Sequence, residues 1–160
     1  MSRDERSRAE AILDLQEGRG PVAVLDDAAI TQLLRRRPRV AVVGASDRPG
    51  RPSRDVFLAL LRAGIDAVPV TPTFASVGGA VAYPDLAAAV AATGPFDIAD
   101  VFRRPEECPV HAREAVDAGA RVLWLQLGIV SWEAARVAHD GGLEVVMDRC
   151  LSVELWRLRG

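Results

Sequence analysis

Two short stretches of this 160-residue chain carry the residue types that bind phosphate groups. The first is Gly44-Ala-Ser-Asp-Arg-Pro-Gly-Arg-Pro-Ser53, in which a glycine leaves an apolar run and Arg48 and Arg51 precede a serine. Backbone N–H groups at a helix start attract anions, and guanidinium groups add charge-assisted hydrogen bonds to phosphate oxygens. We therefore predict phosphate binding here; a plain strand-to-helix turn capped by Ser53 is the alternative.

The second stretch is Val101-Phe-Arg-Arg-Pro105, in which two guanidinium groups follow an aromatic ring. Phe102 offers an apolar face to a ligand, whereas Arg103 and Arg104 offer positive charge. A core phenylalanine followed by a solvated helix start would have the same sequence. Both interpretations stay open at this point.

Three further polar segments follow apolar runs near the C-terminal half of the chain. Gln126 could hydrogen-bond a ligand amide or the backbone of its own loop. For the neighbours Asp148 and Arg149 we favour a structural ion pair. Cys150 is the one reactive group that we expect near the rim of a site.

The first stretch does not match the common nucleotide-binding motifs. Ser46 replaces the second glycine of G-x-G-x-x-G, Gly50 falls late, and the chain has no lysine for a P-loop. An NAD site usually has an acidic residue after its second strand, but Val70-Thr-Pro-Thr73 has none. The 3′-phosphate of coenzyme A would tolerate no carboxylate there, so these residues disfavour NAD and leave room for coenzyme A.

Buried apolar runs alternate with helical patterns over most of the chain. Arg39-Val-Ala-Val-Val-Gly44 is typical of a strand buried on both faces, and a helical stripe of Val56, Leu60 and Ala63 follows it. This alternation implies right-handed crossovers and a parallel sheet, whose ligands bind beyond the carboxyl ends of the strands. We predict strands at 39–44, 66–70, 96–102, 121–126 and 143–147, and helices at 53–62, 84–92, 105–118 and 131–139.

The predicted fold class is α/β: a single Rossmann-like domain with a parallel five-stranded sheet, helices on both faces and an N-terminal helical extension. Residues 1–36 form the extension, which we expect to pack on the domain, and residues 37–160 form the Rossmann-like domain. Within the extension we predict one helix at 4–16 and a second, capped by Asp26 and Asp27, that runs through Leu34.

Composition excludes several classes of function. A net charge of −2 and a hydrophobic content of 49% fit one globular domain without a nucleic-acid or membrane-surface partner. Cys108 and Cys150 do not make a disulfide framework, and His111 and His139 fall on predicted helices, away from strand ends. We see no metal-binding cluster, no signal peptide and no run long enough to span a membrane, so we expect a cytoplasmic protein without catalytic activity of its own.

An ordered set of motifs resembles a known family, the small stand-alone CoA-binding proteins, which are similar to the N-terminal CoA-binding domain of the succinyl-CoA synthetase alpha subunit. The resemblance covers about residues 39–150. It implies a Rossmann-like domain with coenzyme A lying across the strand ends. The motifs are Val42-Val-Gly-Ala-Ser-Asp-Arg-Pro-Gly-Arg-Pro-Ser53, Val68-Pro-Val-Thr-Pro72, Asp97-Ile-Ala-Asp-Val-Phe-Arg-Arg-Pro105, Trp124-Leu-Gln-Leu-Gly128 and Val146-Met-Asp-Arg-Cys150.

Carried over by position, the resemblance implies that residues 44–53 hold the CoA phosphates, 70–73 flank the adenosine end and 102–105 contact the pantetheine arm. Thr71 stands where the family usually has asparagine, and a threonine cannot make the contact of the asparagine side-chain amide. The candidate cofactor-binding residues are Gly44, Ala45, Ser46, Arg48, Arg51, Pro52, Ser53, Val70, Thr71, Pro72, Phe102, Arg103, Arg104, Gln126 and Cys150.

The resemblance also limits the function that we expect. The synthetases carry a phosphorylated histidine in a further domain, and neither histidine of this chain matches it. Cys150 looks like the counterpart of a cysteine near the thiol end of CoA, so a mixed disulfide between Cys150 and CoA is a hypothesis.

The leading interpretation is a binding, carrier or regulatory protein for CoA or acyl-CoA, with a protein partner or a homo-oligomer left open. The alternatives are an NAD(P)-binding enzyme or redox sensor, and the CoA-binding subunit of a multi-chain acyl-CoA ligase. The subunit alternative predicts an exposed apolar patch. Trp132 and Trp156 are candidates for it, although we favour a core position for each.

Overall fold

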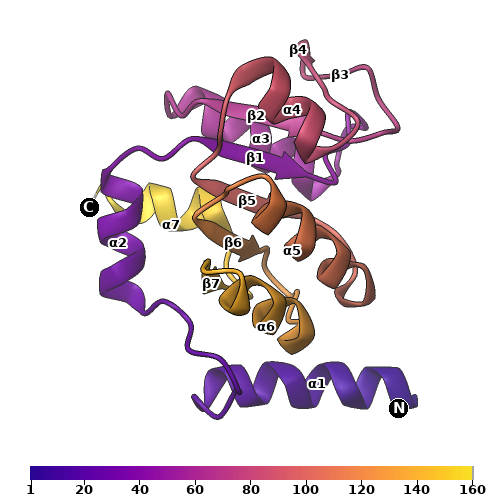
Figure 1. Ribbon diagram of the computed structural model, residues 1–160, viewed down its shortest axis with the longest axis vertical. Coiled ribbons are helices and arrows are strands. Elements are labelled where there is room, and N and C mark those ends of the chain that lie inside the picture. Colours follow the sequence, from indigo (N-terminus) through magenta and orange to yellow (C-terminus); the bar gives the residue numbers. More distant parts are fainter. Residues whose placement is uncertain (160) are drawn as a thin grey trace.

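A computed structural model describes residues 1–159 and shows a parallel five-stranded sheet at its centre (Figure 1). The strand order is β2-β1-β5-β6-β7, and every neighbouring pair is parallel. This confirms the predicted Rossmann-like α/β architecture. The strands are β1 (Val40–Val43), β2 (Ala67–Val70), β5 (Ile98–Val101), β6 (Val122–Leu125) and β7 (Glu144–Val146).

Helices cover both faces of the sheet, and the strands are therefore buried on both sides. Along β1, Ala41 and Val43 face one core, whereas Val40 and Val42 face the other. The first core packs under α4 (Leu86–Thr93), α5 (Cys108–Asp117) and α6 (Trp132–Asp140). The second packs under α2 (Asp27–Arg35), α3 (Pro52–Arg62) and α7 (Leu151–Arg157).

The first helix, α1 (Arg3–Gln16), lies at the end of the molecule beyond α6 (Figure 1). Ser2 and Glu5 form a capping box at its start, which satisfies two backbone N–H groups that the helix itself leaves free. Ala11 and its neighbours pack on the core, and the Nε1 of Trp132 donates to the carbonyl of Ala11 at 3.2 Å. Gly20 lies against the same indole ring, where a Cβ atom would overlap it.

Three local features differ from the sequence-based expectation. A two-stranded hairpin, β3 (Ser76–Val77) and β4 (Ala80–Val81), interrupts the connection between β2 and α4. The helix predicted at 105–118 begins with a separate 3₁₀ turn, Pro105–Glu107. The C-terminal segment, where we predicted no helix or strand, forms α7, whose Leu151 and Leu155 pack on the second core.

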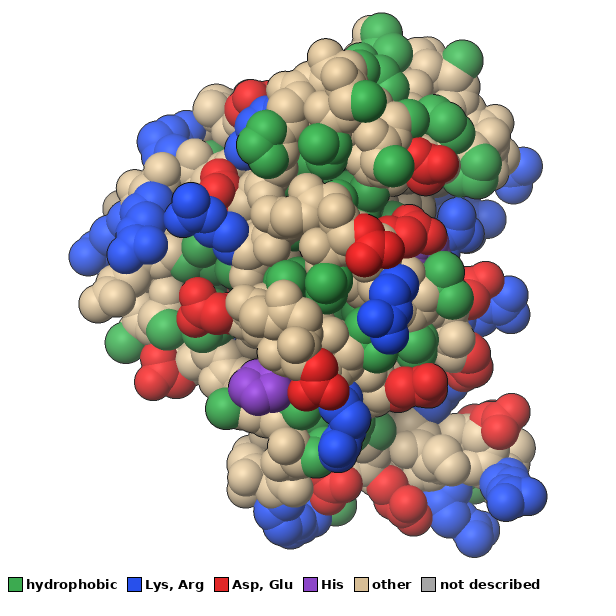
Figure 2. Space-filling view, viewed as in Figure 1, with side chains coloured by type: hydrophobic (Ala, Val, Ile, Leu, Met, Phe, Trp, Pro, Cys, Tyr) green, Lys and Arg blue, Asp and Glu red, His purple; other side chains and the backbone are tan. Residues whose placement is uncertain are grey.

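The surface carries charges of both signs. On the face drawn in Figure 2, several basic side chains gather at the left of the view, and acidic and basic side chains are interspersed over the rest. Trp156 on α7 is 67% exposed, so the expected core position is wrong for this residue, whereas Trp132 is half-buried against α1. Among residues 1–159, no helix combines the length and apolar character needed to cross a bilayer.

Candidate functional site

A pocket of about 880 Å³ opens beyond the carboxyl ends of β1 and β5. The chain runs from β1 outward to β2 and then returns to β5 on the other side of β1, so the strand order reverses between β1 and β5. In open parallel sheets this crevice is the usual ligand site. The volume lies within the range of small-molecule and cofactor pockets.

The structure brings most of the predicted site residues together in this pocket. Val70 and Pro72 are the exceptions: Val70 is buried inside β2, and Pro72 is exposed away from the lining. The predicted residues that line the pocket are Gly44, Ala45, Ser46, Arg48, Arg51, Pro52, Ser53, Thr71, Phe102, Arg103, Arg104, Gln126 and Cys150.

The loop between β1 and α3 is folded tightly at one wall of the pocket. Gly44 has a φ of 83°, and a Cβ atom built on it would lie 2.6 Å from the carbonyl oxygen of Phe102. Only glycine combines this backbone with so close an approach of β5. The Oγ of Ser53 accepts from the N–H of Ser46 at 3.1 Å, and the Oγ of Ser46 accepts from the N–H of Arg48 at 3.1 Å.

Helix α3 therefore starts without a side-chain cap. Its N-cap is Arg51, with no capping hydrogen bond, and Pro52 is the first helical residue. The alternative in which Ser53 caps the helix is wrong, because the Ser53 hydroxyl points back to the preceding loop. Pro52 has no N–H, and the N–H groups of Arg54 and Asp55 donate to the carbonyl of Arg51, so the N–H of Ser53 is the donor that the helix start leaves for an anion.

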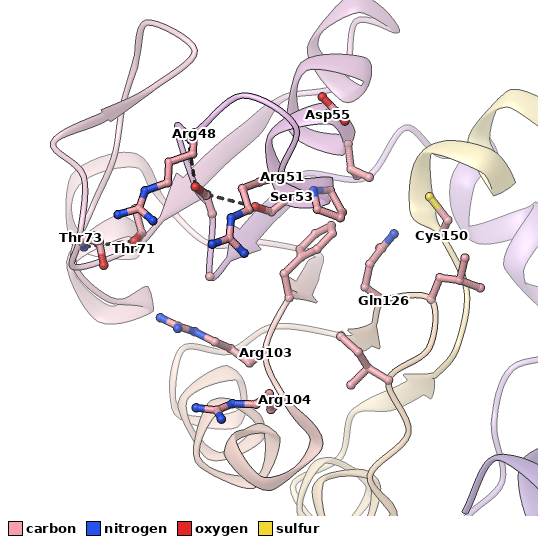
Figure 3. A pocket seen from close by; sticks show the side chains of 18 of the residues that line it. Arg48, Arg51, Ser53, Asp55, Thr71, Thr73, Arg103, Arg104, Gln126 and Cys150 are labelled. Atoms are coloured by element: carbon pink, nitrogen blue, oxygen red, sulfur yellow. Dashed lines mark hydrogen bonds between the residues drawn. The ribbon is translucent and has the colours of Figure 1, made fainter. Parts of the chain in front are cut away.

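Four arginine side chains from two loops line the pocket: Arg48 and Arg51 lie beside the start of α3, and Arg103 and Arg104 lie across from it (Figure 3). Arg48, Arg51 and Arg103 form no ion pair with any residue between 1 and 159, and Arg104 lies 3.8 Å from Glu107. The Nε of Arg103 is buried and lacks a hydrogen-bond partner within the described part of the chain. Guanidinium groups without ion-pair partners, beside the uncapped start of α3, favour the binding of an anion in this half of the pocket.

Cys108 holds the loop that carries two of these arginines. Its thiol lies 3.3 Å from the carbonyl oxygen of Arg104 and 3.6 Å from that of Arg103. Burial and the nearby Glu107 raise the pKa of the Cys108 thiol to about 12. Cys108 is therefore a neutral structural residue, and Cys150 is the cysteine with access to the pocket.

The other half of the pocket is apolar and ends at a thiol. Gln126 and Cys150 lie on the opposite side of the pocket from Arg48, Arg103 and Arg104 in Figure 3, and Phe102 also lines the pocket. Gln126 accepts at its Oε1 from the N–H of the residue after Cys150, at 3.4 Å, and so ties β6 to α7. The Sγ of Cys150 lies 3.3 Å from the Oγ of Ser152.

The predicted ion pair between Asp148 and Arg149 is wrong. Asp148 has a φ of 58°, and its carboxylate accepts from the N–H of Gly128 at 2.7 Å. Arg149 instead binds Asp27 at 2.7 Å and approaches Glu154 at 3.6 Å. The left-handed backbone at Asp148 turns the two side chains to different partners, so Asp148 fixes the loop after β6 while Arg149 joins α2 to α7.

Sequence reasoning missed part of the pocket lining. Asp55 and Val56 follow the start of α3, and Leu127 and Ile129 continue the loop after Gln126. Each follows a predicted site segment by a few residues, so extension of those segments would have found them. The remaining residue, Phe74, comes from the connection that carries the β3–β4 hairpin, for which only the Gly78-Gly79 turn gives a signal.

A buried carboxyl group lies under the pocket and was also missed. Asp100 in β5 is fully buried, and neither oxygen has a hydrogen-bond partner within residues 1–159. Burial, and secondarily the charge of Cys150, raise the pKa of Asp100 well above its usual range. In the folded protein this group is therefore held as a neutral acid over a wider pH range than in the unfolded chain.

The raised pKa of Asp100 predicts a loss of stability as the pH rises. Between the unfolded pKa near 3.8 and the raised folded pKa, the folded state binds the proton and the unfolded state does not. The free energy of unfolding then falls by up to about 1.4 kcal/mol per pH unit from this group alone. We expect Asp100→Asn to remove this slope in urea unfolding measured across that window.

Asp140→Asn is the matched control, because Asp140 is an exposed carboxylate at the end of α6. Its stability profile should run parallel to that of the wild type. A profile for Asp100→Asn that is also parallel to the wild type would show that the carboxyl group titrates alike in the folded and unfolded states.

The two histidines lie on α5 and α6, as predicted. His111 approaches Glu114 on its own helix at 3.5 Å, and His139 is exposed in the last turn of α6. Neither lines the pocket at the strand ends. Within residues 1–159, acidic, histidine and cysteine side chains form no group of three that could hold a metal ion.

Comparison with known proteins agrees with this geometry. The model of a family described as the CoA binding domain matches residues 38–156, which is most of the chain. The chain belongs to this CoA-binding domain family. The matched segment contains every strand of the sheet and every residue that lines the pocket.

Relatives of this CoA-binding domain protein occur in bacteria and archaea. YneT of Bacillus subtilis (strain 168) is 41% identical over 126 residues, which cover 79% of this chain and 91% of YneT. A solved structure from Pyrococcus horikoshii OT3 is 33% identical with a TM-score of 0.78, covering 85% of this chain and 94% of the other. One from Thermus thermophilus is 34% identical with a TM-score of 0.76, covering 84% and 99%.

Proposed function

We propose that this CoA-binding domain protein binds coenzyme A, free or acylated, in the pocket beyond β1 and β5, as a binding, carrier or regulatory protein. The observation that carries the proposal is the division of one pocket into a basic half and an apolar half that ends at Cys150. Coenzyme A has the same division, with phosphates at one end and a thiol on the pantetheine arm at the other. The proposal needs no catalytic group.

The basic half suits the phosphates of the ligand. Arg48 and Arg51 flank the uncapped start of α3, so their guanidinium groups and the N–H of Ser53 converge on one anion position. Thr71 and Thr73 at the end of β2 supply small polar neighbours, and the N–H of Thr73 donates to the Oγ1 of Thr71 at 3.1 Å. These residues offer no carboxylate to repel a phosphorylated ribose.

The apolar half suits the pantetheine arm. Phe102, Leu127 and Ile129 line this side of the pocket, and Gln126 is the amide among them. An arm with two amide groups and methylene segments can pack on these side chains while its polar groups meet loop backbone. In this orientation the thiol of the ligand points toward Cys150.

Calorimetric titration of the reduced protein with CoA tests the proposal. We expect binding on the order of micromolar Kd, weaker binding of dephospho-CoA, and about tenfold weaker binding of CoA by Arg51→Ala. NADP is the control ligand. Binding of NADP without binding of CoA would replace this proposal by a dinucleotide site, and binding of neither would contradict both.

Cys150 gives the proposal a covalent test. With CoA disulfide as the oxidant, the Cys150 thiolate attacks one sulfur, a protein–CoA disulfide forms, and one CoA thiolate leaves. We expect mass spectrometry to find one CoA adduct, located on Cys150, and none on the buried Cys108. Cys150→Ser should form no covalent CoA adduct, while still binding CoA non-covalently. Absence of an adduct on the wild type would rule out a bound CoA whose thiol points toward Cys150.

A further inference from the structure

The side chain of Gln126 is buried, but its amide nitrogen has no partner. The residue follows β6, lines the pocket and is only 5% exposed. The N–H of Leu151 can only donate, so the amide atom that faces it at 3.4 Å is the oxygen Oε1. The other amide atom, Nε2, donates to no group among residues 1–159 and stays accessible. Because Gln126 lines the pocket, this NH₂ group is available to a ligand there.

The sulfur of Cys150 lies at the same end of the pocket (Figure 3). The backbone on both sides of Cys150 is tied to the end of β6. The Nε1 of Trp124 donates to the carbonyl of the preceding residue at 2.8 Å, and the Oε1 of Gln126 accepts from the N–H of the following residue. The Sγ itself lies 3.3 Å from the Oγ of Ser152. The segment that presents the amide donor therefore also fixes the position of the thiol.

A sulfur nucleophile next to a free amide donor suits a ligand with a carbonyl group. When a sulfur attacks a carbonyl carbon, negative charge develops on the carbonyl oxygen, and a donor held at that oxygen stabilises the transition state. Free CoA has no carbonyl group on its sulfur, whereas acyl-CoA has one in its thioester. In the orientation proposed above, the thioester would enter the end of the pocket that holds Gln126 and Cys150.

We propose that this protein takes the acyl group of an acyl-CoA thioester onto Cys150, with the Nε2 of Gln126 donating to the thioester carbonyl oxygen. The activity rests on the CoA site proposed above. The sulfur of Cys150 attacks the carbonyl carbon, the bond from that carbon to the CoA sulfur breaks, and CoA leaves with the proton that the thiol loses. The products are S-acyl-Cys150 and free CoA, so the step needs no other reactant.

The pocket favours retention of the acyl group over its hydrolysis. Within the described part of the chain no histidine lines it, and its one carboxylate, Asp55, is exposed at the start of α3. Efficient hydrolysis of the product would need a base positioned to activate water. Phe102, Leu127 and Ile129 give the acyl chain an apolar surface. The protein is therefore a carrier that is loaded once, and not a thioesterase.

Incubation of the reduced protein with acetyl-CoA tests the transfer. We expect peptide mass spectrometry to find an acetyl group on Cys150, which neutral hydroxylamine removes, and none on the buried Cys108 or in Cys150→Ala. S-acetyl-N-acetylcysteamine, a thioester without the nucleotide, should acetylate Cys150 at least about 100-fold more slowly at equal concentration, because no phosphate anchors it. Equal rates for the two thioesters would overturn the proposal, since the pocket would not direct the reaction.

Calorimetry with free CoA on the same protein separates two kinds of failure. If the protein binds CoA but acetyl-CoA leaves no acetyl group on Cys150, the acyl transfer is overturned and the CoA site stands. If the protein binds no CoA, the site and the transfer are both overturned. Neither result depends on the folding of a variant.

Gln126→Glu tests the donor, because a carboxylate still accepts from the N–H of the residue after Cys150 but has no N–H to donate. The maximal acetylation rate at saturating acetyl-CoA should fall about 100-fold. The Kd of free CoA, which lacks the thioester, should change less than about tenfold. Gln32→Glu makes the same change at an exposed position of α2 and should alter neither value. Weaker binding of free CoA with an unchanged maximal rate would assign the amide to the pantetheine arm and overturn its role in transfer.

Discussion

Replacement of Arg103 by alanine is expected to weaken CoA binding about 10- to 100-fold, the largest effect of any single arginine in the pocket. Its Nε is buried and lacks a partner among the described residues, and it lies 3.1 Å from the position of a Cβ atom on Gly44. A buried donor without a partner becomes satisfied when a phosphate oxygen arrives. A charge-assisted hydrogen bond of this kind contributes about 1.5–3 kcal/mol, which converts to the fold-change above.

The matched control is Arg121→Ala. Arg121 precedes β6 at the amino end of the strands, opposite the pocket, where its exposed side chain lies 3.8 Å from Asp97. It changes the net charge by the same amount as Arg103→Ala, so any general electrostatic attraction of the anionic ligand falls equally in both variants. Calorimetry that finds equal losses for the two would mean that Arg103 contributes only to the overall charge.

Salt dependence separates the same two contributions. Salt screens a partly buried contact less than an exposed one. Raising the salt concentration should therefore weaken CoA binding by the wild type less than it would if only exposed charges attracted the ligand. The difference in affinity between wild type and Arg103→Ala should therefore persist in about 0.5 M salt. Loss of that difference would place the contact of Arg103 with the ligand at an exposed position.

The sheet was predictable because each strand carries a strong local signal. Arg39-Val-Ala-Val-Val-Gly44 is apolar throughout, since both faces of β1 are covered, and Gly64 marks the end of α3 with a φ of 78°. The hairpin gave a weaker signal, because each of its strands has two residues and buries little. Likewise, α7 is short and gives a weak helical pattern, because Leu151 and Leu155 are the only pair of apolar residues that it packs on the second core.

The site was predictable where it depends on position along a strand. Gly44 and Phe102 follow β1 and β5, and a parallel sheet places the ends of neighbouring strands at one edge. Phe74 and Asp100 depend on contacts between distant segments. Phe74 reaches the pocket from the β2–α4 connection, and an acidic residue within a strand pattern does not reveal that both its oxygens are buried.

Replacement of Gly44 by alanine is expected to destabilise the fold by about 3 kcal/mol and to abolish measurable CoA binding. The φ of 83° costs an L-residue about 1–2 kcal/mol, and the added Cβ atom would lie 2.6 Å from the carbonyl oxygen of Phe102. That oxygen belongs to the main chain directly after the central strand, so it cannot rotate away as a side chain would, and overpacking adds about 1–3 kcal/mol. Urea unfolding and calorimetry measure the two losses.

Gly50→Ala isolates the contribution of the close approach. Gly50 lies in the same loop and has the same φ of 83°, but no atom lies within 4 Å of its Cβ position. Its variant should therefore lose only the backbone cost of about 1–2 kcal/mol. The difference between the two variants measures how tightly the loop after β1 is held against β5, where the pocket begins. If they are equally stable, the crevice has room to open there, and the arginines from the two loops are not held at a fixed separation before the ligand binds.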